Sequence, residues 1–301
     1  MFKILKKTQF SEKVFEFRVH APRMAKHAHA GQFLMVRINE TGERVPFTFA
    51  NWNPEEGWIE FIFMVVGKTT QCLSELNEGD EIQDITGPLG CPTEIEGDHV
   101  AVVGGGVGLA IAYPVARTLC EQGKKVSVIM GARNKDLLIL FEQFASLPLE
   151  NLFITTDDGS MGEKGVVTLP LRRLCETDSI DSCFCVGPVP MMKFSTLTCR
   201  EFKIPIVASL NPIMVDGTGM CGCCRVEVGA KPSSPASTAR ISMRTSSTGT
   251  TSLIARRATR PRKPLPSSIM RRTAHARSKV PPQYRSSPHP RERGARGGAR
   301  S

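Results

Sequence analysis

The sequence predicts a small antiparallel β-barrel followed by a parallel α/β domain. In the first 97 residues, short runs rich in β-branched and aromatic residues alternate with turn residues. From about residue 98, apolar runs alternate with longer helical patterns, which is typical of a parallel sheet. We expect four segments in chain order: the barrel at 1–97, the α/β domain at 98–205, a cysteine-rich loop at 206–230 and a basic tail at 231–301.

Three runs are expected to form barrel strands, at 14–19, 32–37 and 58–63. Turns containing Pro, Gly and Asn separate them at short spacing. A helical stretch over 70–76 interrupts the strands and ends near Gly79. Short strands at this spacing are typical of a small closed barrel.

Two short stretches of the barrel carry residue types that bind phosphate or flavin. Arg44-Val45-Pro46-Phe47-Thr48 is expected between two strands, where an arginine suits a pyrophosphate and a hydroxyl suits an isoalloxazine edge. A surface loop is the alternative. Gly67-Lys68-Thr69-Thr70 opens a helix, where its hydroxyls suit a second phosphate contact or a plain N-cap.

The α/β domain is expected to begin with the apolar strand 100–103, the glycine run 104–108 and a helix over 109–121. A glycine run between a strand and a helix suits a phosphate-binding turn, because the helix N-terminus presents free N–H groups. The run is not a strict GxGxxG, and Gly131-Ala132-Arg133 ends the second strand where an acidic residue would hold a ribose. A tight turn without a ligand therefore remains the alternative. Further strands are expected at 126–130, 152–156 and 183–186, and further helices around 138–145, 169–175 and 191–201.

The segment 211–225 reads NPIMVDGTGMCGCCR and places three cysteines within four residues. Thiolates packed this densely usually share a metal. Asp216, Cys221 and Cys224 have the spacing of a plant-type [2Fe–2S] loop, with aspartate in the first cysteine's place. A disulfide pair and a zinc knuckle are the alternatives, but no second CxxC or His pair follows to complete a zinc ribbon.

Charge is distributed unevenly along the 301 residues. The formal net charge is +10, but 17 of the 39 Lys and Arg residues lie from Lys231 onward, against one acid, Glu292. The preceding part is mildly acidic, so nucleic-acid binding would rest on the tail alone. Few aromatics and no apolar period predict disorder in this tail. The ten cysteines, without a secretory signal or a membrane span, predict a reducing cytoplasm, in which the seven outside the loop are mostly small buried hydrophobes.

The order of these motifs resembles the ferredoxin-reductase flavoprotein superfamily, specifically its electron-transfer subunits with a C-terminal [2Fe–2S] loop. Arg-x-Pro-x-Thr is followed by Gly-Pro-Leu-Gly at 87–90, the glycine run, Gly-Pro-x-Pro-Met-Met at 187–192 and the cysteine loop. The loop is most similar to that of the small subunit of NADH-dependent ferredoxin:NADP oxidoreductase, also known as a sulfide dehydrogenase subunit. The electron-transfer subunit of dihydroorotate dehydrogenase is the competing relative, but its expected flavin arginine is replaced here by Val45.

The resemblance implies a Greek-key barrel that binds FAD, a domain that binds NAD(P)H and a [2Fe–2S] cluster. It implies electron transfer from the nucleotide through the flavin and the cluster to or from a larger flavoprotein or iron–sulfur subunit in a heterodimer, with ferredoxin as a further partner. The metal ligands it implies are Asp216, Cys221 and Cys224. The FAD contacts it implies are Arg44, Pro46, Phe47, Thr48, Gly67, Thr69 and Thr70, and the nucleotide contacts are Gly104, Gly105, Gly106, Val107, Gly108, Gly187, Pro188 and Met191.

The family pattern places a fourth cysteine about a dozen residues after Cys224, yet no cysteine follows Cys224. Residues 232–244 can be back-translated so that a neighbouring frame reads KFACVDGPDFDA, which supplies one. A frame-shifted coding region is therefore one hypothesis for the tail, and a genuine disordered basic tail is the other. Two alternative functions also remain: a cluster-less NAD(P)H–flavin diaphorase and a nucleic-acid binder acting through the tail.

Overall fold

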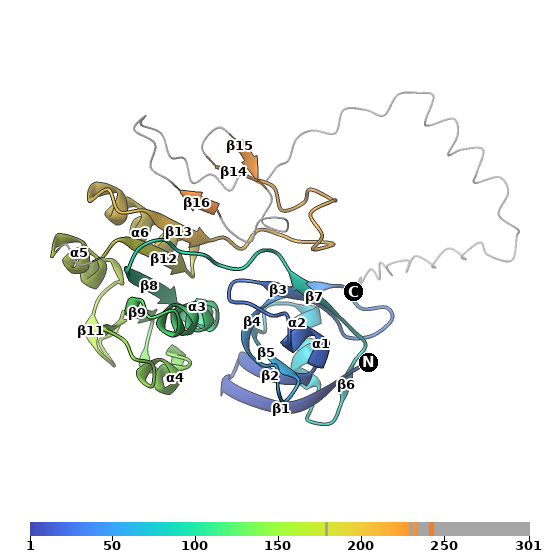
Figure 1. Cartoon of the computed structure of the whole chain (residues 1–301). Coiled ribbons are helices and arrows are strands. Elements are labelled where there is room, and N and C mark those ends of the chain that lie inside the picture. Colours follow the sequence, from blue (N-terminus) through green and yellow to red (C-terminus); the bar gives the residue numbers. More distant parts are fainter. Residues whose placement is uncertain (178–179, 229–230, 234–240, 244–301) are drawn as a thin grey trace, which may run out of the picture. The chain divides into compact units, whose positions relative to one another are not determined.

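The computed structural model describes residues 1–177, 180–228, 231–233 and 241–243. Two seven-stranded sheets dominate it, one antiparallel and one mostly parallel. Figure 1 shows them as two bodies, strands β1 to β7 in blue and cyan and strands β8 to β13 in green to yellow. Among the described helices, none combines the length and apolar character needed to cross a membrane.

The antiparallel sheet runs in the order β6-β1-β2-β5-β4-β3-β7. Its two edge strands, β6 and β7, follow each other in the chain with only Gln83 between them, so the sheet curls into a near-closed barrel. This confirms the predicted antiparallel barrel. Its strands are β1 (Phe2–Ser11), β2 (Val14–His20), β3 (Phe33–Arg37), β4 (Val45–Asn53), β5 (Trp58–Met64), β6 (Glu81–Ile82) and β7 (Asp84–Leu89).

Aromatic rings fill the barrel interior. Phe17, Phe49, Phe61 and Phe63 are fully buried, and the rings of Phe17 and Phe63 meet edge to face at 5.2 Å. Edge-to-face contact stabilises an aromatic pair beyond the area it buries. The short helix α1 (Pro22–Ala25) and helix α2 (Lys68–Glu75) complete this domain, and the latter confirms the predicted helix with a start two residues earlier.

The prediction that Arg44 to Thr48 form a connection between strands is wrong for most of this stretch, because β4 begins at Val45. Pro46 lies inside this strand, although proline cannot donate to a strand ladder. At Pro46 the strand pairs only with Met35 of β3, and its pairing with β5 begins at Phe49. The nitrogen of Pro46 therefore lies where one side of the strand has no partner, and the strand tolerates it.

The second sheet runs in the order β11-β10-β9-β8-β12-β13-β16 and is parallel apart from β16. This confirms the predicted parallel α/β domain. Its strands are β8 (His99–Gly105), β9 (Lys125–Ala132), β10 (Asn151–Thr156), β11 (Glu163–Lys164), β12 (Ser182–Val186), β13 (Ile206–Ser209) and β16 (Ile241–Met243). Its helices are α3 (Leu109–Glu121), α4 (Phe141–Ala145), α5 (Thr168–Glu176) and α6 (Val189–Glu201), with 3₁₀ turns η1 (Gly106–Gly108) and η2 (Lys135–Leu137).

The strand order reverses between β8 and β12. From β8 the chain continues outward through β9 and β10, then returns to place β12 on the other side of β8. In open parallel sheets, ligands bind outside the carboxyl ends of the strands at such a switch point. Here that point lies between Gly105 and Gly187.

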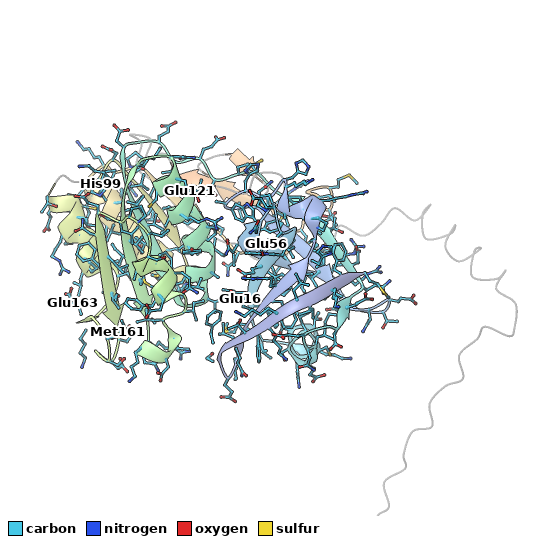
Figure 2. The ribbon with its side chains drawn as sticks, turned by 60° about the horizontal axis from the view of Figure 1, so that its bottom comes forward. Glu16, Glu56, His99, Glu121, Met161 and Glu163 are labelled. Carbon is cyan, nitrogen blue, oxygen red and sulfur yellow. The ribbon has the colours of Figure 1, made fainter. Side chains whose placement is uncertain are left out.

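A polar ladder joins three strands at the opposite end of this sheet. His99 Nε2 lies 2.8 Å from Ser127 Oγ, and Asn151 Nδ2 donates to the same hydroxyl at 3.1 Å. Figure 2 shows His99 on this domain. Because Ser127 is fully buried and its hydroxyl has these partners, the ladder satisfies a polar core group rather than contributing to the switch point.

Two predicted elements differ from the structure. The helix expected over 138–145 is helical only over Phe141–Ala145, because Leu140 adopts a left-handed backbone at φ 60°. Disorder was predicted from Lys231, but Lys231–Ser233 (β15) pairs with Val226–Val228 (β14), and Ile241–Met243 pairs with β13. Open strand edges have unpaired backbone groups, which these short strands satisfy. The rest of the predicted tail, 234–240 and 244–301, lies outside the described residues.

Candidate functional site

A cavity of about 1080 Å³ opens at the switch point of the parallel sheet and extends along the barrel. Its size is at the upper end of the range for small-molecule sites, which suits a ligand as large as a dinucleotide. It is bordered by β4 of the barrel and by the turns after β8, β9 and β12. Of the predicted contacts, it brings together Pro46, Phe47, Thr48, Gly105, Gly106, Val107, Gly108, Gly187, Pro188 and Met191.

On the barrel side, the cavity is bordered by the first half of β4 and by the end of β5. Pro46 and Thr48 border it, while the ring of Phe47 also stacks on Phe61 at 5.3 Å with an interplanar angle of 9°. The aromatic core thus holds this part of β4 rigidly. An apolar wall with a hydroxyl at Thr48 fits the requirements of a flavin, a flat apolar ring system with polar edges.

The glycine run forms the opposite wall. Gly106 adopts φ 56° and has open space where a side chain would begin, so its backbone is uncovered. At Gly108 the space is closed, because a Cβ there would lie 2.7 Å from the carbonyl oxygen of Val186. The 3₁₀ turn η1 leads directly into α3, and the N–H of Leu109 already bonds to the carbonyl of Gly106. The N–H groups without a partner inside the helix are therefore those of residues 106–108, which border the cavity. The run therefore has the open backbone that a pyrophosphate requires. Gly104 lies behind this wall, where Leu109 and Ala112 cover it.

Met191 covers the crevice between β8 and β12. Its side chain occupies the space where a Cβ on Gly105 would lie, and a Cβ on Gly187 would lie 2.8 Å from its Cε. The three residues, together with Pro188, form one continuous wall of the cavity. Larger residues at either glycine would displace the methionine, so both glycines have a packing role at the site.

Four predicted FAD contacts lie outside the cavity lining. Arg44 Nη2 is bound to Asp84 Oδ2 at 2.7 Å on the barrel surface. Gly67, Thr69 and Thr70 lie at the start of α2, where Thr70 Oγ1 accepts the backbone N–H of Gly67 at 3.1 Å and donates to its carbonyl at 3.0 Å. The Thr70 hydroxyl therefore caps its own helix, as the alternative interpretation of this stretch expected.

The predicted metal ligands do not converge. Asp216 accepts the backbone N–H of Thr218 at 2.9 Å, and this hydrogen bond, with a second one from Cys221, lowers the pKa of its carboxyl below the usual value. Cys221 is exposed, whereas Cys224 is buried among Phe33 and Met35 of the barrel. Across the described residues, no three His, Cys, Asp or Glu side chains are grouped so that they could hold a metal ion. The described loop therefore shows no grouped ligand set, and the [2Fe–2S] cluster stays a prediction.

Among the cysteines outside the loop, burial varies with the element that carries them. Cys175, Cys183, Cys185 and Cys199 are buried around β12, α5 and α6. Burial raises the pKa of the Cys185 thiol well above its usual range, so this thiol stays protonated and unreactive. The expectation of small buried hydrophobes is confirmed for these four, but Cys91 is exposed and Cys72 and Cys120 are half-buried.

The cavity also includes residues that the sequence did not single out. These residues are Phe33, Phe194, Asp157 after β10, and residues 209–212 and 214. Arg133, which the sequence placed at the end of the second strand of the sheet, borders the cavity as well. Segment 209–214 follows β13, and the carboxyl ends of parallel strands meet at one edge, so the strand signal over 206–209 would have located it. Phe194 had no such signal, because an apolar residue on a helix usually faces a core.

Three comparisons with known proteins agree with this geometry. The family described as oxidoreductase FAD-binding domain matches residues 1–92. A Thermotoga maritima relative, the dihydroorotate dehydrogenase B (NAD(+)) electron transfer subunit homolog, is 51% identical over 226 residues, which are 75% of this chain and 79% of the relative. The corresponding electron transfer subunit of Desulforamulus reducens is 32% identical over 231 residues, covering 75% of this chain and 87% of the relative.

Among solved structures, the NADH-dependent reduced ferredoxin-NADP oxidoreductase, studied for flavin-based electron bifurcation, has a similar chain. It superposes with a TM-score of 0.76 at 47% identity and covers 81% of this chain and 88% of its own. The cytochrome b5 reductase domain of Ulva prolifera nitrate reductase shares the fold alone, with a TM-score of 0.53 at 19% identity, covering 67% of this chain and 91% of its own.

Proposed function

The chain belongs to the family of FAD-binding electron-transfer subunits that includes these relatives, and on that premise we propose that it passes electrons from NAD(P)H through FAD to a larger partner subunit. One observation carries the proposal: β4 of the FAD-binding domain and the glycine turn of the parallel sheet border the same cavity. A flavin and a nicotinamide bound to those two walls would therefore face each other. FAD, when bound, supplies the chemistry, because it accepts a hydride as an electron pair and releases electrons singly.

The residues of this chain would bind and orient the two cofactors. Pro46 and Thr48 would border the flavin, and the open backbone at Gly106 with the N-terminus of α3 would hold a pyrophosphate. Met191, above Gly105 and Gly187, would close the nicotinamide end of the cavity against water. This arrangement requires no ionisable side chain to transfer a proton.

Ferredoxin:NADP oxidoreductase of the sulfide dehydrogenase type is the assembly we favour. The 51% identical relative bears the name of a dihydroorotate dehydrogenase subunit homolog, whereas the 47% identical structure is a ferredoxin-NADP oxidoreductase. The cysteine loop favours the latter, since aspartate rather than cysteine occupies its first position. The partner would accordingly be a larger flavoprotein or iron–sulfur subunit, with ferredoxin as a further partner.

The cluster-less NAD(P)H–flavin diaphorase is a second candidate, supported by the lack of a complete ligand set in the described residues. Its potential ligands are not grouped, and no cysteine follows Cys224. Both candidates would bind their cofactors in the same cavity. They differ only in whether electrons pass from the flavin to an iron–sulfur cluster. The [2Fe–2S] cluster with Asp216, Cys221 and Cys224 as ligands therefore stays a prediction, and we derive no step through it.

Anaerobic purification of the full chain, followed by flavin and iron quantitation, tests the proposal. We expect a flavin absorption spectrum, about one FAD per chain and bleaching of that spectrum on addition of NADH or NADPH. About two irons per chain would show that the loop assembles a cluster, and FAD without iron would show that this chain holds flavin without one. Absence of FAD after incubation with excess cofactor would overturn both.

A further inference from the structure

The barrel and the α/β domain contact each other along one face of α3. Ala110, Tyr113 and Arg117 lie on this face, since they recur at spacings of three and four residues. Ala110 is buried in a hydrophobic cluster that also contains Val14 and Ala50 of the barrel. The two domains thus share part of their core.

Arg117 makes the polar part of this contact. Its Nη1 donates a hydrogen bond to Asn51 Oδ1, and its guanidinium lies 4.7 Å from the ring centroid of Trp52. Within α3, it also lies 6.0 Å from the ring centroid of Tyr113, and its Nε is 3.5 Å from Glu121 Oε1. A single α3 side chain therefore holds two consecutive residues of β4 through a hydrogen bond and a cation–π contact.

A β-bulge in β4 makes the contact with Asn51 possible. The register of β4 against β5 shifts between Phe49 and Asn51. In a regular strand, Ala50 and Asn51 would point to opposite faces. Here Ala50 belongs to the cluster shared with α3, and Asn51 binds Arg117, so both contact the α/β domain. Bulges commonly redirect side chains beside functional sites.

Arg117 and Asn51 belong to α3 and β4, and other residues of both elements border the cavity. Ala110 borders the cavity and lies two helical turns before Arg117, which is about 10 Å along α3. Thr48 borders the opposite wall and lies three residues before Asn51, also about 10 Å along β4. None of Asn51, Trp52 and Arg117 borders the cavity itself. The contact therefore holds the two walls at a set separation without touching a ligand.

We propose that Arg117 is a positioning residue, which sets the distance between the flavin and nicotinamide halves of the cavity by holding α3 against β4. The inference rests on the proposed function, because it concerns how two bound cofactors meet. A rigid clamp matters here because hydride transfer needs the reacting atoms about 3–3.5 Å apart, and small misplacements lower the rate steeply.

The test uses the full chain loaded with FAD and whichever of NADH and NADPH reduces the wild type. Arg117→Ala removes both β4 contacts. Asn51→Ala removes the hydrogen bond to Arg117, together with the one that Asn51 Oδ1 accepts from the backbone N–H of Trp52, and leaves the Trp52 ring in place. Glu121→Gln is the matched control, because it removes the ion pair on the same helix but leaves the contacts to Asn51 and Trp52. Glu121 is shown on the last turn of α3 in Figure 2.

Three quantities are measured: FAD content, nucleotide affinity, and the rate of flavin reduction at saturating nucleotide with its long-wavelength charge-transfer absorbance. For Arg117→Ala we expect reduction to slow by about tenfold or more and the charge-transfer absorbance to fall. FAD content and nucleotide affinity should stay within about twofold, since Arg117 touches neither ligand. Glu121→Gln should reduce at the wild-type rate, and Arg117→Lys should be intermediate, because lysine keeps the charge but not the planar stack.

An unchanged reduction rate in Arg117→Ala overturns the inference, as does a loss of FAD that parallels the loss of rate. Failure of the proposed function is distinguishable, because the wild type itself would then hold no FAD or resist reduction. In that case calorimetry of the cofactor-free chain still tests whether Arg117 holds the two domains together through Asn51 and Trp52. The two domains of the wild type should unfold in one transition. The conservative variant Arg117→Lys should broaden or split that transition, whereas Glu121→Gln should leave it unchanged.

Discussion

The carboxylate of Asp216 accepts a hydrogen bond from the backbone N–H of Cys221, with 3.1 Å between Oδ2 and the nitrogen. The two residues were predicted to share a metal, and in the structure they share this hydrogen bond. The loop is closed by its own backbone donors, as in an Asx turn. Each carboxylate oxygen keeps a further lone pair, so these hydrogen bonds do not by themselves exclude a metal on Asp216.

The thiols of the loop should differ in reactivity. Cys221 and Cys223 are exposed, whereas Cys224 is 2% exposed and packs with barrel residues. After treatment with a chelator, we expect a maleimide to label Cys221 and Cys223 within minutes, and Cys224 only in denaturant. Peptide mass mapping measures this. Equal labelling of all three in the native chain would show that Cys224 is not held against the barrel.

Iron content should be low in the purified FAD-loaded chain. We expect less than about one iron per chain, because the loop donors are not grouped and the sequence has no cysteine after Cys224. Colorimetric iron analysis and the EPR spectrum of the reduced protein measure it. Two irons per chain with a [2Fe–2S] signal would contradict this and would require the loop to rearrange around the cluster.

Two glycines of the same turn should respond differently to alanine. At Gly106 a Cβ meets open space but the backbone φ is 56°, so Gly106→Ala should cost about 1–2 kcal/mol of stability and weaken nucleotide binding. At Gly108 a Cβ would lie 2.7 Å from the Val186 carbonyl, so Gly108→Ala should destabilise more strongly by displacing α3 from β12. Thermal unfolding and nucleotide titration separate the two effects. If Gly106→Ala were less stable than Gly108→Ala, the open position at Gly106 and the closed one at Gly108 would not explain the effects of alanine.

Glu16 should make the barrel less stable as pH rises. Burial, and then the nearby carboxylate of Glu60, raise the pKa of Glu16 from 4.5 to about 6. The folded state therefore favours the protonated acid. Below about pH 4.5 this carboxyl is protonated in both the folded and the unfolded chain and does not lower the free energy of unfolding. Above about pH 6 it is ionised in both, and its ionised form lowers the free energy of unfolding by the full amount.

Glu16→Gln removes that titration. We expect the variant to be about 1 kcal/mol more stable than the wild type at pH 7.5 and nearly equal to it at pH 4. Denaturant unfolding at the two pH values measures the difference. Figure 2 shows Glu16, which belongs to β2, and the exposed Glu56→Gln is the control, expected to leave the pH dependence of stability unchanged. A wild-type stability that is flat between pH 4.5 and 6 would exclude the effect.

The coding sequence offers a direct test of the tail. We expect independent reads across codons 228–235 to show a neighbouring frame that continues as KFACVDGPDFDA, placing a cysteine shortly after β15. With that cysteine present, the iron content should rise to about two per chain, since a fourth thiolate becomes available. An uninterrupted frame ending at Ser301 would establish the basic tail as genuine.

Sequence patterns located the elements whose signal is local. The strand at 100–103 and the helix over 109–121 appear as β8 and α3, because a continuous apolar run and a glycine turn determine both. By contrast residues 44–48 were expected between two strands, whereas β4 begins at Val45 and includes Pro46. Only its pairing with β3 on one side explains how the strand accommodates proline.

The site was predictable where motif and topology coincide. Gly105 to Gly108 and Gly187 border the cavity because both lie at carboxyl ends of neighbouring parallel strands. Arg44 was not predictable in the same way, because an arginine beside a motif can bind a ligand or a neighbouring acid, and here it binds Asp84. The choice depends on which charge the folded chain brings within reach.

By itself the sequence predicted the antiparallel barrel, the parallel α/β domain and the family, because local periodicity and the order of the motifs encode them. Only the tertiary structure decided that β4 and the glycine turn border one cavity, that Asp216 binds its own loop and that Arg117 holds Asn51 across the domains. The β4 bulge, the strand order and the core shared by the two domains bring these residues together. Contacts of that kind depend on the packing of the whole chain, which no local pattern records.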